Sequence, residues 1–399
     1  MKSVRDINVE GKKVLVRVDL NVPLKDTEMG NKEVVNDSRI RAVLPTIKYL
    51  IEKKAKVIIL SHLGRPDGKV VKEYALDPVI LRLQELLGTV ITHCGECDSK
   101  VVKEALNNLK EGEVLSLGNL RFHSEEEKND QEFAKKLASL GDIYVNDAFA
   151  VSHRAHASVE AITHFLPSYA GFLMEKELNT LSSLIKNPVH PFVLIMGGAK
   201  AADKIPVIMR LENQVDGVML GGVVADTFLA ANGEDLGSSK IEKDRLDEVR
   251  AICNKLKSDG KELYLPSDLV VSPNLDGTGE IITMAVGDKY EAGWKALDIG
   301  QSTVDKYRDI LLKARTIFWN GNMGMSEVSP FDEGTRKLAG ILAEATDAGA
   351  KTVICGGDTT GLVDNMGLSD KMTYLSTGGG AALEFLAGLE LPGVKALEA

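Results

Sequence analysis

The sequence has 399 residues, of which 44% are hydrophobic and 27% are charged, and it carries a formal net charge of −10. This length exceeds one ordinary hydrophobic core and the composition is that of folded globular proteins, so we expect two domains. The net acidity argues against nucleic-acid binding, and no apolar run approaches the roughly 20 residues that a membrane span needs. The chain also opens without a secretory signal, so we expect a cytoplasmic protein with no membrane partner.

Short apolar, β-branched runs alternate along the chain with segments of helical periodicity. The predicted strands are Val14–Val18, Val57–Leu60, Glu113–Leu117, Asp142–Val145, Phe192–Met196, Gly217–Leu220, Glu262–Leu265, Thr316–Trp319, Thr352–Ile354 and Met372–Leu375. The predicted helices include Ile40–Lys53, Pro78–Leu87, Asp130–Ser139 and Arg336–Ala348. Such alternation is typical of parallel sheets covered by helices on both faces, which places the chain in the α/β class.

Turn-forming residues divide the chain near its middle. Leu166–Gly171 interrupts the pattern, a helical segment follows over residues 171–186, and Asn187–Pro191 leads into the next strand. We therefore predict two doubly wound, Rossmann-like domains, residues 1–170 and 187–387, joined by a helix and separated by a cleft.

The strand ends of the first half carry several cations. In open parallel sheets, ligands bind beyond the carboxyl ends of the strands, so side chains there are candidates for a site. These cations are His62, Arg65, Arg121, His153 and Arg154, with Arg39 at the start of the first helix. Guanidinium groups bind phosphate and carboxylate through paired hydrogen bonds. A single arginine more often forms a surface ion pair, but recurrence at one edge predicts a ligand with more than one negative charge.

Asp19 and Asn21 follow the first predicted strand and offer acceptors in place of positive charge. They fit as acceptors for a ligand hydroxyl or as orienters of the arginines. Alternatively, they only stabilise the turn before Pro23. Further along, the run Glu125–Glu127 has the composition of a solvated turn, and His156 has no role beyond local hydrogen bonding.

A glycine-rich turn follows the first strand of the second half. Gly197 and Gly198 let backbone amides approach a phosphate, and a helix N-terminus favours negative charge. Lys200 and Lys204 are four residues apart, hence on one face of the helix predicted to begin there. The segment is not a P-loop, because no Gly-x4-Gly-Lys-Ser/Thr motif occurs in the chain.

Two further glycine-rich turns, Gly356–Thr359 and Gly378–Gly380, open helices at the same predicted sheet edge. Within the first of them, Asp358 sits where a carboxylate could hold Mg²⁺ between phosphates. Gly221–Gly222 and Asn320–Gly321 add open backbone that suits a flat base and a polyphosphate. Glycines at helix starts are often only structural, but three such turns at one edge favour a nucleotide site.

Together these segments resemble the phosphoglycerate kinase family. The resemblance runs in order and at family spacing from about residue 5 to residue 397, and it rests on Arg17–Pro23, Ser61–Pro66, Asn119–His123, His153–His156, Gly197–Lys204, Gly356–Thr359 and Ser376–Ala381. It implies reversible transfer of the acyl phosphate of 1,3-bisphosphoglycerate to MgADP, giving 3-phosphoglycerate and MgATP in glycolysis and gluconeogenesis. It also implies a monomer whose first domain binds the triose, whose second domain binds the nucleotide, and whose tail, residues 388–399, returns to the first domain.

The resemblance assigns roles to individual residues. Those implied to bind the triose are Asp19, Leu20, Asn21, Arg39, His62, Leu63, Gly64, Arg65, Arg121 and Arg154. Those implied to bind the nucleotide and its Mg²⁺ are Gly197, Gly198, Lys200, Lys204, Gly221, Gly222, Ala296, Asn320, Glu327, Gly356, Gly357, Asp358 and Thr359, with Asp358 as the metal ligand. Candidates for stabilising the moving phosphoryl group are Arg39, Lys200 and the amides of Gly378, Gly379 and Gly380.

Departures from the family pattern gather around the nucleotide. Asn322 replaces the proline after Trp-Asn-Gly, Met325-Ser326 replace Val-Phe, Ala296 replaces a glycine, and Cys355 replaces the first glycine of Gly-Gly-Gly-Asp. The base preference therefore stays open. One alternative is a non-catalytic homologue that binds the triose but has an impaired nucleotide site.

A second alternative is a nicotinamide-dependent dehydrogenase, against which the missing Gly-x-Gly-x-x-Gly fingerprint argues. Cys94 and Cys97 form an isolated Cys-x-x-Cys, which is weak evidence for zinc, so we expect ordinary thiols.

Overall fold

The computed structural model describes residues 1–28, 30–97 and 99–398. Met29, Asp98 and Ala399, which fall within the predicted first domain and its tail, lie outside the described residues. The chain divides into two compact units: unit 1 comprises residues 1–180 and 390–399, and unit 2 comprises residues 181–389. Helix α6 (Phe172–Lys186) contains the point at which the chain passes from the first unit to the second.

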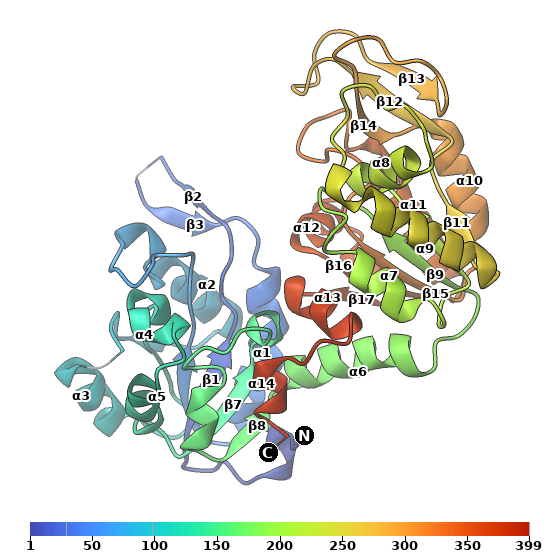
Figure 1. Cartoon of the computed structure of the whole chain (residues 1–399). Coiled ribbons are helices and arrows are strands. Elements are labelled where there is room, and N and C mark those ends of the chain that lie inside the picture. The colour runs from blue at the N-terminus through green and yellow to red at the C-terminus, as the bar shows by residue number, and fades with distance from the viewer. Residues whose placement is uncertain (29, 98, 399) are drawn as a thin grey trace. The chain divides into compact units, whose positions relative to one another are not determined.

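Unit 1 is built on a six-stranded parallel sheet in the order β5-β6-β4-β1-β7-β8. Its strands are β1 (Lys13–Val18), β4 (Lys56–Leu60), β5 (Ile91–His93), β6 (Val114–Ser116), β7 (Ile143–Asp147) and β8 (Ser168–Ala170). Its helices are α1 (Ser38–Glu52), α2 (Asp77–Leu87), α3 (Lys100–Asn108), α4 (Ser124–Glu127), α5 (Gln131–Ala138) and α14 (Pro392–Lys395). Strands β2 (Leu24–Asp26) and β3 (Lys32–Val34) form a separate antiparallel hairpin, which Figure 1 shows projecting from this unit.

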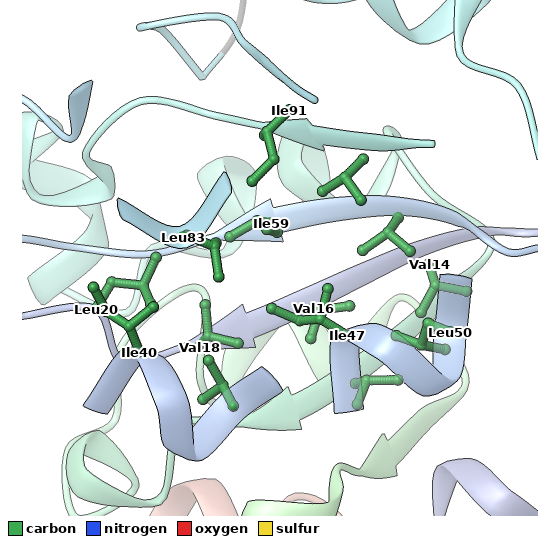
Figure 2. Packing of buried hydrophobic residues seen from close by; sticks show 14 of the residues in the cluster. Val14, Val16, Val18, Leu20, Ile40, Ile47, Leu50, Ile59, Leu83 and Ile91 are labelled. Carbon is green, nitrogen blue, oxygen red and sulfur yellow. The ribbon is translucent and has the colours of Figure 1, made fainter. Parts of the chain in front are cut away.

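Successive side chains of each strand point to opposite faces of this sheet, and helices cover both faces. Val14, Val16 and Val18 of β1 pack with α1 and α2 on one face, as Figure 2 shows for β1 and α1. Leu15, which points to the opposite face, packs with Phe133 of α5 and with side chains of α3. Because both faces are buried, the strands read as continuous apolar runs, which is the pattern typical of parallel sheets.

Unit 2 contains a second six-stranded parallel sheet, in the order β11-β10-β9-β15-β16-β17. Its strands are β9 (Phe192–Met196), β10 (Gly217–Leu220), β11 (Glu262–Tyr264), β15 (Thr316–Asn320), β16 (Lys351–Cys355) and β17 (Tyr374–Ser376). Its helices are α7 (Ile205–Leu211), α8 (Gly222–Ala231), α9 (Leu246–Ser258), α10 (Gln301–Leu311), α11 (Glu333–Asp347), α12 (Gly357–Asn365) and α13 (Gly380–Leu386). Trp319 of β15 packs with Tyr307 of α10 and Leu338 of α11 in the core on one face.

A smaller antiparallel sheet of unit 2, in the order β13-β12-β14, was not predicted from the sequence. It consists of β12 (Asp268–Ser272), β13 (Ile282–Ala285) and β14 (Lys295–Ile299), which lie together in Figure 1. Strand β13 is largely exposed, so it lacks the apolar run by which the parallel strands were recognised. Short 3-10 helices complete the elements at Val4–Asp6, Lys72–Tyr74, Leu120–Phe122, Phe149–Val151, Ala161–His164, Lys243–Arg245 and Ser369–Lys371.

The α/β class with two parallel sheets is confirmed. Among the residues that the structure describes, no helix is both long enough and apolar enough to cross a bilayer.

Candidate active site

The first candidate site lies at the carboxyl ends of β1 and β4 in unit 1. Its centre is Arg17, which is fully buried. Arg17 begins the segment Arg17–Pro23 that carries part of the family resemblance, but the sequence assigned it no role. The Arg17 guanidinium donates to the Nδ1 atom of His62 at 3.1 Å and to the Oγ atom of Ser158 at 2.8 Å. Since a guanidinium has only donors, His62 accepts through Nδ1 and keeps its proton on Nε2.

Glu126 balances the buried charge of Arg17. Its carboxylate accepts from the Ser158 hydroxyl at 2.6 Å and from the Ser158 backbone amide at 3.0 Å. Burial raises the pKa of Glu126, and nearby Arg17 works against that rise. The prediction of a solvated Glu125–Glu127 turn is therefore wrong for Glu126, because a distant serine and arginine supply partners that local sequence does not reveal.

The loop after β1 holds Arg39 in place. The Asp19 carboxylate, itself only 4% exposed, forms an ion pair with the Arg39 guanidinium and accepts from the backbone amide of Asn21. The Asn21 side chain in turn accepts from the backbone amide of Gly64 at 2.9 Å. Asn21 thus joins the β1 and β4 loops, and the Arg39 ion pair fits the role of orienter that was predicted for Asp19.

Arg121 joins the same loops from the turn after β6. It is 6% exposed, donates to the carbonyl oxygen of Gly64 at 2.9 Å, and lies 3.5 Å from the Glu127 carboxylate. Charges on Arg121, Arg17 and Arg39 all act on His62, so these three arginines lie in one field. They form the arginine cluster: Arg17, Arg39 and Arg121.

The histidines of this site are neutral. Burial, followed by the charge of Arg17, holds the pKa of His62 well below its usual range. Burial and the charge of Arg121 lower the pKa of His156 to about 3. The positive charge that would attract an anion therefore comes from the arginines, and His62 contributes a hydrogen-bond acceptor to Arg17.

Two predicted residues lie at the rim. Arg154 is exposed and donates to the ring of His153 at 3.2 Å, and its charge acts on Arg121 and His156. Arg65 is exposed, and no contact within the described residues ties it to the arginine cluster. Leu20 and Leu63 are buried beside these loops.

The second candidate site is a cavity of about 820 Å³ in unit 2. Turns after β9, β10, β15, β16 and β17 all contribute to its lining, so it collects the carboxyl ends of neighbouring parallel strands. The predicted residues that line it are Gly198, Lys200, Lys204, Gly222, Ala296, Asn320, Glu327, Gly356, Gly357, Asp358, Thr359, Gly379 and Gly380. This volume falls within the roughly 300–1,000 Å³ typical of small-molecule sites.

Gly197, Gly221 and Gly378 were also predicted but are not part of the cavity lining. A Cβ atom on Gly197 would lie 2.3 Å from the carbonyl oxygen of Asn322. This glycine is therefore needed for the close approach of two turns, and it does not face the cavity space.

The helix after β9 begins later than predicted. It starts at Ile205, so Lys200 and Lys204 lie in the preceding turn and not on one helix face. The reason is distant in sequence, because the Glu242 carboxylate accepts from the backbone amides of Ala201 at 2.7 Å and Ala202 at 3.0 Å. Both lysines still line the cavity.

Asn320 anchors one of these lysines. Its side-chain oxygen accepts from the Lys204 ammonium group, and its side-chain nitrogen donates to the carbonyl oxygen of Cys355 at 3.0 Å. Burial lowers the pKa of Lys204. Lys200, in contrast, is exposed and adds a second positive charge to the cavity lining.

The departures from the family pattern are accommodated by local contacts. Asn322, in place of proline, accepts from the Thr359 hydroxyl at 2.8 Å and donates to the Ser326 hydroxyl. Cys355, in place of glycine, is fully buried. The substitutions therefore keep the turns joined.

Asp358 fits a nucleotide-borne cation. It is exposed in the first turn of α12 and lines the cavity. Mg²⁺ commonly takes one or two carboxylates together with phosphate oxygens and water, so one carboxylate at phosphate-binding turns suffices. Across the described ranges, no three His, Cys, Asp or Glu side chains gather as a ligand set for a metal ion.

Comparisons with known proteins show the family to which the chain belongs. A family model described as phosphoglycerate kinase matches residues 4–389. The chain belongs to the phosphoglycerate kinase family. This membership confirms the phosphoglycerate kinase function predicted from the sequence and removes the dehydrogenase alternative.

Individual relatives agree over nearly the whole length. The chain is 48% identical to a phosphoglycerate kinase from Pelotomaculum thermopropionicum, covering 99% of this chain and 98% of that one. It is 47% identical to one from Thermosipho africanus, covering 99% and 97%. Among solved structures, the Coxiella burnetii phosphoglycerate kinase has a TM-score of 0.84 at 37% identity, covering 99% and 98% of the two chains. The Pyrococcus horikoshii phosphoglycerate kinase has a TM-score of 0.87 at 35% identity, covering 100% and 98%.

Proposed function

We propose that the arginine cluster of unit 1 binds the anionic triose and that the cavity of unit 2 binds the nucleotide with Mg²⁺. The phosphoryl acceptor in this proposal is the carboxylate of 3-phosphoglycerate, and the protein acts as a cytoplasmic monomer. The observation that carries the proposal is the cavity: glycine-rich turns, Lys200, Lys204 and Asp358 meet in one space large enough for a nucleotide.

The chemistry needs no general base. A carboxylate acceptor is already ionised at neutral pH, so its oxygen forms the new bond to phosphorus while the bond to the leaving diphosphate oxygen breaks. No proton moves in this exchange. The neutral state of His62 and His156 agrees with a site whose residues bind and orient the ligand without a proton-transfer step.

The work of the protein is then to hold two polyanions together while charge spreads over the moving phosphoryl group. Arg39 is oriented by Asp19, and Lys200 stands at the cavity, so each can stabilise that charge. The amides of Gly378–Gly380 at the start of α13 would add donors. When bound, Mg²⁺ held by Asp358 would neutralise charge between phosphate oxygens. Because the two ligands are assigned to different units, phosphoryl transfer requires their reacting atoms to be brought into line.

The test is a coupled assay of 3-phosphoglycerate and MgATP turnover in the wild type, Arg39→Ala and Lys200→Ala. We expect both variants to lose at least about 100-fold in kcat, the scale seen when one charge-stabilising donor is removed. Arg41→Ala, two residues from Arg39 on α1 and paired with Asp37, and Lys257→Ala, on the exposed face of α9, are matched controls that should retain activity. Wild-type protein that binds 3-phosphoglycerate without turnover would favour the non-catalytic alternative.

A further inference from the structure

Asn119 is a buried side chain in the turn after β6, and the function proposed so far gives it no role. It is 1% exposed. Its side-chain oxygen accepts from the backbone amide of Arg121 at 3.0 Å, at the start of the 3-10 helix Leu120–Phe122. Its side-chain nitrogen donates to the carbonyl oxygens of Leu63 at 2.7 Å and of Tyr74 at 2.9 Å. One carboxamide thus joins three segments of the chain.

These contacts use both N–H donors of the carboxamide. The two carbonyl oxygens belong to different loops, because Leu63 follows β4 and Tyr74 ends the 3-10 helix that precedes α2. Capping of a turn does not by itself require asparagine, since serine and aspartate cap equally well. A hydroxyl group has one donor and a carboxylate has none, so neither can join both loops. The position therefore calls for a carboxamide because of the two loops that it connects.

The two joined loops meet again at Gly64. A Cβ atom on Gly64 would lie 2.3 Å from the ring of Tyr74, so this ring packs directly on the turn. The Gly64 carbonyl oxygen accepts from the Arg121 guanidinium at 2.9 Å, and the Gly64 amide donates to the side chain of Asn21. Asn119 therefore holds Arg121 at its backbone amide, and it also holds the loop whose carbonyl oxygen receives the guanidinium.

We propose that Asn119 is a positioning residue for triose binding, which acts by fixing Arg121 and the Gly64 turn in place. The proposal rests on the assignment of the arginine cluster to the triose. Both amide hydrogens of Asn119 are already donated within the protein, so its effect reaches the triose only through its neighbours. The ring of Tyr74 supports the same turn.

The experiment measures kcat, the KM for 3-phosphoglycerate and the KM for MgATP in the wild type, Asn119→Ala and Asn119→Ser. Asn119→Ala should raise the KM for 3-phosphoglycerate at least about tenfold, because a small displacement of a positioned group can cost up to about 100-fold. The KM for MgATP should not change, since unit 2 forms the nucleotide cavity. Asn119→Ser keeps an oxygen that can cap the turn but cannot join both loops, so it should behave like Asn119→Ala. A wild-type KM for 3-phosphoglycerate in either variant would overturn the proposal.

Tyr74 offers a second test that leaves every hydrogen bond of Asn119 in place, because Asn119 contacts only the backbone carbonyl oxygen of Tyr74. Tyr74→Ala removes the ring from Gly64 and should raise the KM for 3-phosphoglycerate, whereas Tyr74→Phe keeps the ring and should match the wild type. These variants decide the question if Asn119→Ala does not fold. An unchanged KM in Tyr74→Ala would then overturn the proposal.

Asn129→Ala separates positioning from a general loss of stability. The Asn129 side chain accepts from the Ala161 amide at 3.2 Å and donates to Glu160, neither of which belongs to the arginine cluster. Its φ of 55° is also unfavourable for alanine. Both Asn129→Ala and Asn119→Ala should lower the melting temperature, but only Asn119→Ala should raise the KM for 3-phosphoglycerate. An equal rise in Asn129→Ala would contradict a positioning role.

Arg121→Ala distinguishes failure of this proposal from failure of the proposed function. If the arginine cluster binds the triose, Arg121→Ala raises the KM for 3-phosphoglycerate whatever Asn119 does. An unchanged KM in Arg121→Ala would refute the assignment of the cluster. A raised KM in Arg121→Ala beside an unchanged KM in Asn119→Ala would refute only the role of Asn119.

Discussion

The Ser158 hydroxyl forms hydrogen bonds with two buried groups of opposite charge. It accepts from Arg17 and donates to Glu126, and all three side chains are fully buried. Because they are buried, neither Arg17 nor Glu126 can exchange its hydrogen bond with Ser158 for one with water. A buried ion pair adds little stability by itself, but removing one of its partners is strongly unfavourable.

Replacing Ser158 by alanine is therefore expected to lower the free energy of unfolding by about 1–3 kcal/mol, the cost of leaving a buried polar group without its partner. Denaturant unfolding measures this change. Ser139→Ala, at an exposed serine, is the control. An unchanged midpoint for Ser158→Ala would show that the two ions find other partners.

Arg17 also shows what the sequence could and could not tell at this scale. It is a charged residue within an apolar segment, which is a visible signal of a special role. Its partner could not be predicted, because Ser158 lies 141 positions away. The lysines and glycines of the second half were found because strand ends of one parallel sheet meet at one edge.

Among the elements, helix α6 begins on a buried carboxylate at the end of β7. The Asp147 side chain accepts from the backbone amide of Met174 at 3.0 Å, which satisfies a donor in the first turn of the helix. Burial raises the pKa of Asp147 to about 7, although its hydrogen bonds to Thr46 and to the helix amides oppose the rise.

A raised pKa makes the contribution of Asp147 to stability dependent on pH. The folded protein holds the proton that the unfolded chain has already released, so this contribution is complete below about pH 4 and is lost as the pH rises to about 7. Asp147→Asn cannot ionise. The free energy of unfolding of Asp147→Asn, measured relative to that of the wild type, should therefore rise by roughly 1–3 kcal/mol between pH 4 and pH 8. Denaturant titrations at both pH values measure this, and parallel curves would contradict it.

The elements themselves divide into those that sequence specifies locally and those that it does not. Parallel strands such as β9 and β15 are buried on both faces and read as apolar runs, so they were predicted. Strand β13 is exposed and was missed. The late start of α7 depends on Glu242, about 40 residues away, and no local pattern indicates it.

At the scale of the whole molecule, the last residues of the chain pack back into unit 1. The Gly393 amide donates to the carbonyl oxygen of Ser152 at 2.9 Å, and Leu391 and Leu397 are buried. A Cβ atom on Gly393 would lie 2.6 Å from the side chain of Val159. The tail thus fits its site only with glycine at this position.

Gly393→Ala is expected to lower the melting temperature, by overpacking that costs about 1–3 kcal/mol. Gly340→Ala in α11 is a control of opposite sign, because its Cβ would meet open space and alanine favours a helix. Differential scanning calorimetry measures both variants. A Gly393→Ala protein as stable as the wild type would mean that the tail adjusts freely.

Since residues 1–180 and 390–399 share unit 1, unit 2 is inserted into its neighbour's chain and both of its ends are tied there. A mechanical load applied between the two termini, as in an optical trap, is therefore carried entirely by unit 1 at first. Unit 2 comes under tension only after unit 1 has unfolded. The connectivity of the chain thus protects the proposed nucleotide cavity from a force applied between the two ends.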